Sequence, residues 1–171
     1  RAEGNSTGNI RFTNVNHVWR GKKKNCIYCG AGIGEFGNRG GRENHAYEFI
    51  HIPTSDSITS YLSNAFGADV DFDVVIGNPP YQINPEGGTR TKPIYDKFVN
   101  QAIRLQPRYI AMVIPSRWHT TGLGLTSFRN EMLTSGKIRS ITTYPQAKEV
   151  FPAVEVKGGI CHFLWDRHHN G

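Results

Sequence analysis

A short apolar strand that runs into two consecutive prolines constrains this 171-residue chain more than any other feature. Residues 74–76 read Val-Val-Ile, which is typical of a buried strand. Pro79 and Pro80 cannot continue that strand, because proline donates no backbone N–H and fixes φ. The residue before each proline is also held away from helix. The sequence therefore predicts a rigid extended loop over Asn78–Tyr81, at the strand end where open α/β sheets bind ligands.

The predicted loop carries groups suited to holding an aromatic amine. The side-chain oxygen of Asn78 and the backbone carbonyl of Pro79 can accept both hydrogens of an exocyclic amino group. Tyr81 can stack on the ring that carries the amine. Such an amine is a weak nucleophile because its lone pair is delocalised into the ring, and two acceptors would localise that pair. This pattern predicts methylation of N6 of adenine or N4 of cytosine. A purely structural Pro-Pro turn is the alternative.

With the preceding strand Asp73–Gly77, this loop resembles the catalytic motif of the DNA adenine-N6 methyltransferases of restriction–modification systems. The resemblance runs from about Asp71 to Gly171 and includes segments 114–118 and 157–159. It implies S-adenosyl-L-methionine as methyl donor and double-stranded DNA with a flipped-out adenine as substrate. Adenine is favoured over cytosine because the motif begins with Asn rather than Ser. The catalytic residues that the resemblance implies are Asn78, Pro79, Pro80 and Tyr81.

The sequence after the loop predicts alternating helices and strands. Apolar periodicity predicts helices over residues 93–105 and 125–133. Gly136 lies near the C-terminal end of the second helix, where glycine is common. Apolar runs predict further strands over residues 108–115, 137–144 and 158–166. This order predicts an α/β fold, a Rossmann-like methyltransferase sheet that is largely parallel and has right-handed crossovers. The last two strands are expected to close it as an antiparallel hairpin.

Four residues outside the motif are candidates for contacts in the same site. Arg117 and Trp118 follow the strand over residues 108–115, so they are expected at the same sheet edge as the loop. They are either substrate contacts or ordinary loop packing. Gln82 and Tyr95 are candidates for shaping the pocket.

Charge and cysteine content agree with a nucleic-acid partner. The chain has 20 Lys and Arg against 14 Asp and Glu, a formal net charge of +6 and a pI of about 9.4, a balance that suits a polyanion. No apolar stretch approaches the roughly 20 residues needed to span a bilayer, and no secretory signal pattern opens the chain. Three cysteines argue against a disulfide framework. We therefore expect a cytoplasmic protein with no membrane contact.

A Cys-x-x-Cys-Gly turn near the start of the chain is half of a zinc-binding knuckle. Two histidines follow it at a spacing close to that of Cys2His2 sites. The predicted ligands of a structural zinc ion are Cys26, Cys29, His45 and His51. Surface histidines beside a reduced cysteine pair are the alternative. A redox pair is disfavoured, because no strand–helix pattern flanks the cysteines.

The chain is predicted to have two parts, a polar segment with the zinc knuckle over residues 1–60 and the catalytic part of a methyltransferase-like α/β domain over residues 61–171. The glycine-rich stretch 30–37 resembles a cofactor turn only superficially, because no apolar strand leads into it, and we expect a loop there. No other segment before Asp69 offers such a turn. The sequence therefore predicts a fragment that carries the catalytic half and binds S-adenosylmethionine weakly or not at all. The cofactor-binding part would belong to the same enzyme or to a partner subunit.

Two other classes of function stay open at this level. The chain can be a non-catalytic DNA-binding module, in which the zinc knuckle and basic residues at 22–24, 39 and 42 contact phosphates. It can also be an assembly module of a modification system, in which the sheet is structural. Among enzymes, RNA, protein glutamine and free bases are further possible substrates, and the same loop also fits amide nitrogen acceptors.

Overall fold

The computed structural model describes residues 12–13, 17–22, 24–37, 43–52, 55–67, 69–85, 87, 90–120, 123–153 and 155–171. Of the basic residues expected to contact phosphate, Lys23, Arg39 and Arg42 lie outside this set. The side chain of His45 is also outside the described residues. Within them, no helix combines the length and the apolar character needed to cross a membrane.

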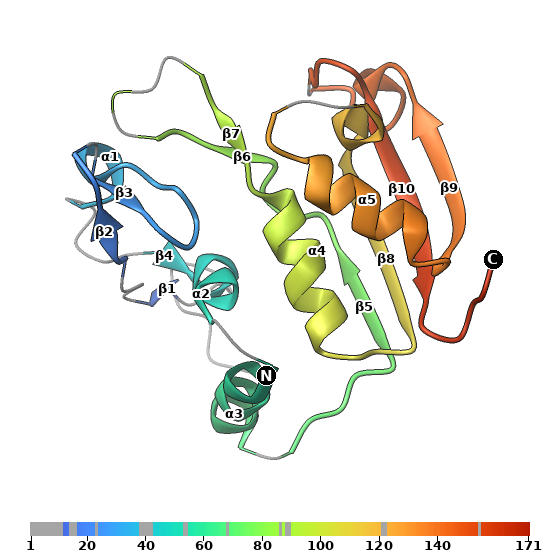
Figure 1. Ribbon diagram of the computed structural model, residues 1–171, viewed down its shortest axis with the longest axis horizontal. Coiled ribbons are helices and arrows are strands. Elements are labelled where there is room, and N and C mark those ends of the chain that lie inside the picture. Colours follow the sequence, from blue (N-terminus) through green and yellow to red (C-terminus); the bar gives the residue numbers. More distant parts are fainter. Residues whose placement is uncertain are drawn as a thin grey trace.

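The strands of the first part of the chain have two residues each, whereas the second part contains the strands of the main sheet (Figure 1). The first part contains β1 (Phe12–Thr13), β2 (Trp19–Arg20), β3 (Asn25–Cys26), α1 (Ile33–Phe36), β4 (Glu43–Asn44), α2 (His45–His51) and α3 (Ser55–Phe66). The second part contains β5 (Val74–Gly77), β6 (Gln82–Ile83), β7 (Lys92–Pro93), α4 (Tyr95–Arg104), β8 (Tyr109–Pro115), η1 (Ser116–His119), α5 (Thr126–Thr134), β9 (Ile138–Tyr144), η2 (Ala147–Glu149) and β10 (Ile160–Asp166). The strands and helices predicted after residue 70 are therefore present.

The main sheet has four strands in the order β5-β8-β10-β9. Strands β5 and β8 are parallel, whereas β10 is antiparallel to both of its neighbours. The predicted antiparallel pairing of the last two strands is confirmed, but the sheet is mixed rather than largely parallel. The reason is that β10 inserts between β8 and β9. Five of its seven residues are buried, which suits a central strand, while the mostly exposed β9 suits an edge.

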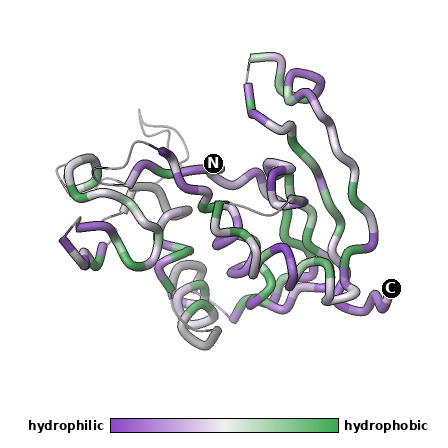
Figure 2. Tube along the Cα trace, turned by 45° about the horizontal axis from the view of Figure 1, so that its top comes forward, coloured by the Kyte–Doolittle hydropathy of each residue, from purple (hydrophilic) through white to green (hydrophobic). Residues whose placement is uncertain are grey.

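Helices α4 and α5 cover one face of this sheet (Figure 1). Alternate strand residues point toward the helices, as expected where one face is buried. These residues are Ile110, Met112 and Ile114 on β8 and Cys161, Phe163 and Trp165 on β10. They pack against Tyr95, Val99 and Ala102 of α4 and Phe128 and Met132 of α5. Figure 2 shows hydrophobic residues along these strands and hydrophilic ones toward the C-terminus.

One face of the edge strand β5 is open. Its Val75 packs against the core under the helices, but Val74 is 46% exposed and Ile76 is 80% exposed. Strand β5 pairs only with β8, so its other edge is also unpaired within the described part of the chain. Natural proteins usually cover an apolar sheet edge of this kind.

The N-terminal elements pack beside helix α4 and the β6–β7 hairpin. A second apolar cluster joins Cys26, Cys29 and Ile50 from these elements to Ile83 and Ile94 of the hairpin region. The buried side chain of Gln101 in α4 donates hydrogen bonds to the backbone oxygens of Phe49 (2.6 Å) and Ile52 (2.9 Å). The backbone N–H of Gly32 donates to the carbonyl of Asn84 at 3.3 Å. The N-terminal elements and the sheet domain therefore share a core.

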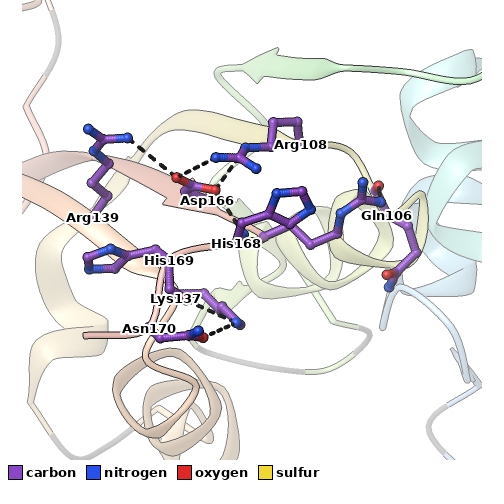
Figure 3. A network of polar contacts seen from close by, with 9 residues as sticks. Gln106, Arg108, Lys137, Arg139, Asp166, His168, His169 and Asn170 are labelled. Atoms are coloured by element: carbon purple, nitrogen blue, oxygen red, sulfur yellow. Dashed lines mark hydrogen bonds and ion pairs between the residues drawn. The ribbon is translucent and has the colours of Figure 1, made fainter.

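A buried carboxylate holds the sheet together at the end opposite the Asn78 loop (Figure 3). Asp166 is 3% exposed. Its Oδ1 lies 3.1 Å from Nε of Arg108, and its Oδ2 lies 3.4 Å from a guanidinium nitrogen of Arg139. The backbone N–H of His168 also donates to Oδ1 at 2.9 Å. Asp166 therefore links the beginnings of β8 and β9 to the end of β10.

Replacing Asp166 with alanine is expected to lower the free energy of unfolding by about 2–3 kcal/mol, because charge-assisted hydrogen bonds to a buried carboxylate are lost. Urea denaturation measures the change. Arg139→Ala is the matched control: its side chain is 56% exposed, so its loss is expected to cost only roughly 0–1 kcal/mol. Equal losses in the two variants would show that the buried carboxylate has no special weight.

Candidate active site

Strand β5 ends at Gly77, and the backbone leaves the sheet in the segment Asn78–Tyr81, which has no regular secondary structure. Asn78 is exposed, while Pro79 and Pro80 are half-buried. The loop is fixed at its far end, where the N–H of Ile94 donates to the carbonyl of Tyr81 at 3.2 Å. The structure therefore has a loop at the predicted place, at the carboxyl end of β5 and directly before the β6–β7 hairpin.

A pocket of about 480 Å³ opens beside this loop, a size that is usual for small-ligand sites. Its walls come from the loop, the β6–β7 hairpin, the start of α4, η1 and the segment before β10. The lining residues are Tyr81, Gln82, Thr91, Pro93, Tyr95, Pro115, Arg117, Leu123, Glu155, Val156 and Lys157. Tyr81, Gln82, Tyr95 and Arg117 were expected near the site and meet here. Asn78 and Pro79 lie at the start of the loop and are not among the lining residues.

Tyr81 and Tyr95 both line the pocket, and the hydroxyl of each is buried and has no hydrogen-bond partner among the described residues. Burial raises the pKa of both tyrosines, and a smaller contribution comes from Cys161 at Tyr81 and from Asp96 at Tyr95. Both hydroxyls therefore stay protonated at neutral pH and can donate or accept. Buried polar groups without partners are rare in folded proteins, so these two hydroxyls are unusual features of the pocket wall.

Two basic side chains, Arg117 and Lys157, border the pocket and are exposed to solvent. Two glycines with positive φ, Gly158 (+87°) and Gly159 (+75°), follow Lys157 and turn the chain back into β10. The carbonyl of Gly159 accepts from the N–H of Ser116 at 3.1 Å, which ties this turn to the segment that carries Arg117. Arg117 and Lys157 bring two positive charges to the pocket, which the carboxylate of Glu155 also lines.

The sequence matches the family described as Eco57I restriction-modification methylase over residues 3–151. The chain belongs to this restriction-modification methylase family. It is also 37% identical over 174 residues to an "Uncharacterized adenine-specific methylase" from Mycoplasma pneumoniae (strain ATCC 29342 / M129 / Subtype 1). That alignment covers 98% of the chain and 41% of the relative, so the chain spans less than half the length of that protein. No solved structure matches the chain significantly.

In this Eco57I-family chain, Trp118 lies in the core rather than in the pocket. It is fully buried, its indole Nε1–H donates to Sγ of Cys161 at 3.4 Å, and its ring meets that of Phe128 edge-on at 5.6 Å. Of the two alternatives for this residue, ordinary packing is therefore the one that the structure supports. Arg117 points the other way, because neighbouring residues of the short helix η1 face different sides.

Away from the pocket, the Eco57I-family chain gathers two thiols and two imidazoles. His17, Cys26, Cys29 and His51 each offer one ligand atom, and these atoms all lie within 4.8 Å of one another. A hydrogen bond with Cys29 lowers the pKa of the Cys26 thiol far below its usual range, with smaller contributions from His17 and His51. Three predicted ligands meet here. His17 was missed because the spacing pattern places histidines after the cysteines, whereas this one precedes them.

The glycine-rich stretch belongs to the same cluster of N-terminal elements. Residues Ile33–Phe36 form the single turn of helix α1, where a loop was expected. The strand before it, β3, has two residues and pairs with β2, outside the main sheet. Gly30 has φ +80°, which lets the Cys-x-x-Cys turn close.

Proposed function

We propose that the enzyme to which this chain belongs transfers a methyl group from S-adenosyl-L-methionine to N6 of adenine in DNA. The observation that carries the proposal is the Asn78–Tyr81 loop at the carboxyl end of β5, beside a pocket that Tyr81 and Tyr95 line. Membership of a restriction-modification methylase family and similarity to a protein named as an adenine-specific methylase support the choice of adenine in DNA.

The chemistry of the loop matches what an adenine amine needs. The Asn78 side-chain oxygen and the Pro79 carbonyl would accept from the two N–H groups, which localises the nitrogen lone pair. Tyr81 would stack on the base and contribute roughly 1–3 kcal/mol of binding free energy. The bound donor would supply an electrophilic methyl group on sulfur. The amine proton leaves after the lone pair is committed, so positioning and exclusion of water matter more than a strong base.

The target adenine has to leave the DNA duplex to reach this site, because its amine is enclosed within the helix. The pocket beside Tyr81 is the proposed receptor for the flipped base. Arg117 and Lys157 are exposed at its border, where they can contact the phosphates that flank the extruded nucleotide. The net charge of +6 favours the same polyanionic substrate.

The open face of β5 is the proposed docking place for the part of the enzyme that holds the methyl donor. Val74 and Ile76 expose apolar surface there, and the edge of β5 can pair with one more strand. The chain spans 41% of its Mycoplasma relative, which leaves length for such a part in an enzyme of that size. A strand added at this edge would bring its own carboxyl end next to Asn78 if it runs parallel to β5. The chain alone is then expected to bind the cofactor weakly.

Methyl transfer by the complete enzyme tests the proposal. The enzyme would be incubated with duplex DNA and isotopically labelled S-adenosylmethionine. The DNA would then be digested to nucleosides, which would be separated by liquid chromatography and identified by mass spectrometry. Labelled N6-methyladenine is the expected product, and RNA of the same sequence is the control substrate. Labelled N4-methylcytosine would overturn the choice of base, and methylated RNA or protein alone would overturn the choice of DNA.

A further inference from the structure

Four potential metal ligands from three separate segments converge in the N-terminal elements. His17 precedes β2, Cys26 lies in β3, Cys29 lies in the turn that follows, and His51 ends helix α2. Sγ of Cys29 is 3.5 Å from Nδ1 of His17, and Sγ of Cys26 is 3.9 Å from Nε2 of His51. Both thiols are buried, with exposures of 3% at Cys26 and 1% at Cys29.

These separations fit a four-coordinate zinc ion. Zinc bonds of about 2.3 Å to sulfur and 2.0–2.1 Å to nitrogen place tetrahedral ligand atoms about 3.3–3.8 Å apart. The two S···N distances of 3.5 and 3.9 Å lie at this value or slightly above it, and all four ligand atoms lie within 4.8 Å of one another. Thiolate and imidazole together are the donor set that zinc prefers, and all three cysteines of the chain are free of disulfides.

The surroundings hold the ligands in place. The N–H of Ala31 donates to Sγ of Cys29 at 3.5 Å, and the N–H of Gly30 donates to the carbonyl of Cys26 at 2.9 Å, which closes the turn between the two sulfurs. The His17 ring stacks on Trp19 at 4.7 Å and meets His51 edge-on at 4.9 Å. Hydrogen bonds and packing of this kind orient metal ligands and tune their basicity.

We infer that His17, Cys26, Cys29 and His51 bind a structural zinc ion that supports the β6–β7 hairpin behind the candidate active site. Cys26 and Cys29 belong to the same apolar cluster as Ile83 of β6 and Ile94. Ile94 in turn donates its N–H to the carbonyl of Tyr81, which lines the pocket. The metal site does not depend on the proposed methylation. Only the statement that the hairpin helps to hold a bound base rests on the proposed function.

Zinc content of the complete enzyme tests the ligand set. The wild-type enzyme, purified without chelators, is expected to carry one zinc ion more than the His17→Ala and Cys26→Ser variants, measured by inductively coupled plasma mass spectrometry. His45→Ala is the matched control, because His45 satisfies the sequence spacing of a Cys2His2 site and His17 does not. The His45→Ala variant is expected to keep its zinc. A zinc-free wild-type enzyme, or zinc lost from His45→Ala and kept by His17→Ala, would overturn the assignment.

A measurement on the wild-type enzyme guards against variants that fail to fold. Cobalt(II) exchanged into the site is expected to give the intense d–d absorption of tetrahedral coordination together with thiolate-to-metal charge transfer. A weak spectrum without charge transfer would overturn the site.

Hydrogen exchange tests the support of the hairpin without reference to catalysis. Removal of the metal with a chelator is expected to speed amide exchange over residues 81–94 by at least about tenfold, because local opening becomes easier. Residues 160–166 of β10 are the internal reference and should not change. Zinc loss with unchanged exchange over residues 81–94 would keep the metal site and refute its link to the pocket. Methyl transfer can fail or succeed independently of both results.

Discussion

Replacing Asn78 with alanine in the complete enzyme is expected to lower kcat for methyl transfer by about 10²–10³-fold, the usual loss when one preorganised polar group at a reacting centre is removed. Asn78 begins the loop at the end of β5, and its exposed side chain faces no competing partner that the structure describes. Its amide oxygen would accept one of the two amine hydrogens. Without it the lone pair stays delocalised, so the chemical step slows while DNA affinity persists.

The measurement is single-turnover transfer of labelled methyl to duplex DNA, combined with DNA binding by fluorescence anisotropy. Asn84→Ala is the matched control. Asn84 lies in the connection after β6, and its side chain is exposed. Its hydrogen bond with Gly32 is made by its backbone carbonyl, which the substitution leaves in place. It is expected to keep full activity. If Asn78→Ala retained turnover within a few-fold of wild type, the catalytic role of the loop would be wrong.

The second large effect is expected at Gly159, where the turn before β10 passes close to the end of β9. Its φ is +75°, and a Cβ there would lie 2.1 Å from the carbonyl oxygen of Tyr144 and 2.8 Å from that of Pro145. Both obstacles are backbone atoms, which cannot rotate away. Gly159→Ala is therefore expected to lower the free energy of unfolding by about 2–4 kcal/mol, from the strain of positive φ and from overpacking together.

Gly124→Ala separates the two causes. Gly124 also has a positive φ (+78°), but an added Cβ meets no atom of the described chain within 4 Å. Only backbone strain applies there, so a loss of about 1–2 kcal/mol is expected in urea denaturation. Similar losses at Gly124 and Gly159 would mean that the turn before β10 moves aside. Gly158 and Gly159 would then have no role in holding Lys157 and Arg117 at the pocket.

Local sequence patterns predicted most of the sheet domain, because its elements have strong periodicity and clear ends. The apolar run at β5 stops at its prolines, and Gly136 follows helix α5 with φ +65°, as expected for a helix end. Pro93 was expected in the first turn of α4. It instead pairs with Gln82 in the β6–β7 hairpin, and the helix begins at Tyr95. Strand pairing with Gln82 therefore places Pro93 in the hairpin, although its local preference is for the first turn of a helix.

Other parts of the site depend on contacts between distant residues, which a spacing pattern does not encode. His17 meets Cys29 because β2 and β3 pair, and nothing in the residues around His17 signals that pairing. Lys157 was noted only as part of a resemblance, yet the turn at Gly158 and Gly159 brings it to the pocket. The central position of β10 likewise reflects its burial against both neighbours rather than its place in the chain.

The exposed edge of β5 has a consequence for handling the polypeptide. Ile76 and Val74 lie on β5, whose outer edge is unpaired in the part of the chain that the structure describes, and such edges are surfaces at which separate chains add strands to one another. During synthesis or recombinant production, the chain can aggregate through this edge for as long as nothing covers it. The same edge that would complete an active site therefore also sets a requirement for solubility, and co-expression with the covering part is the practical remedy.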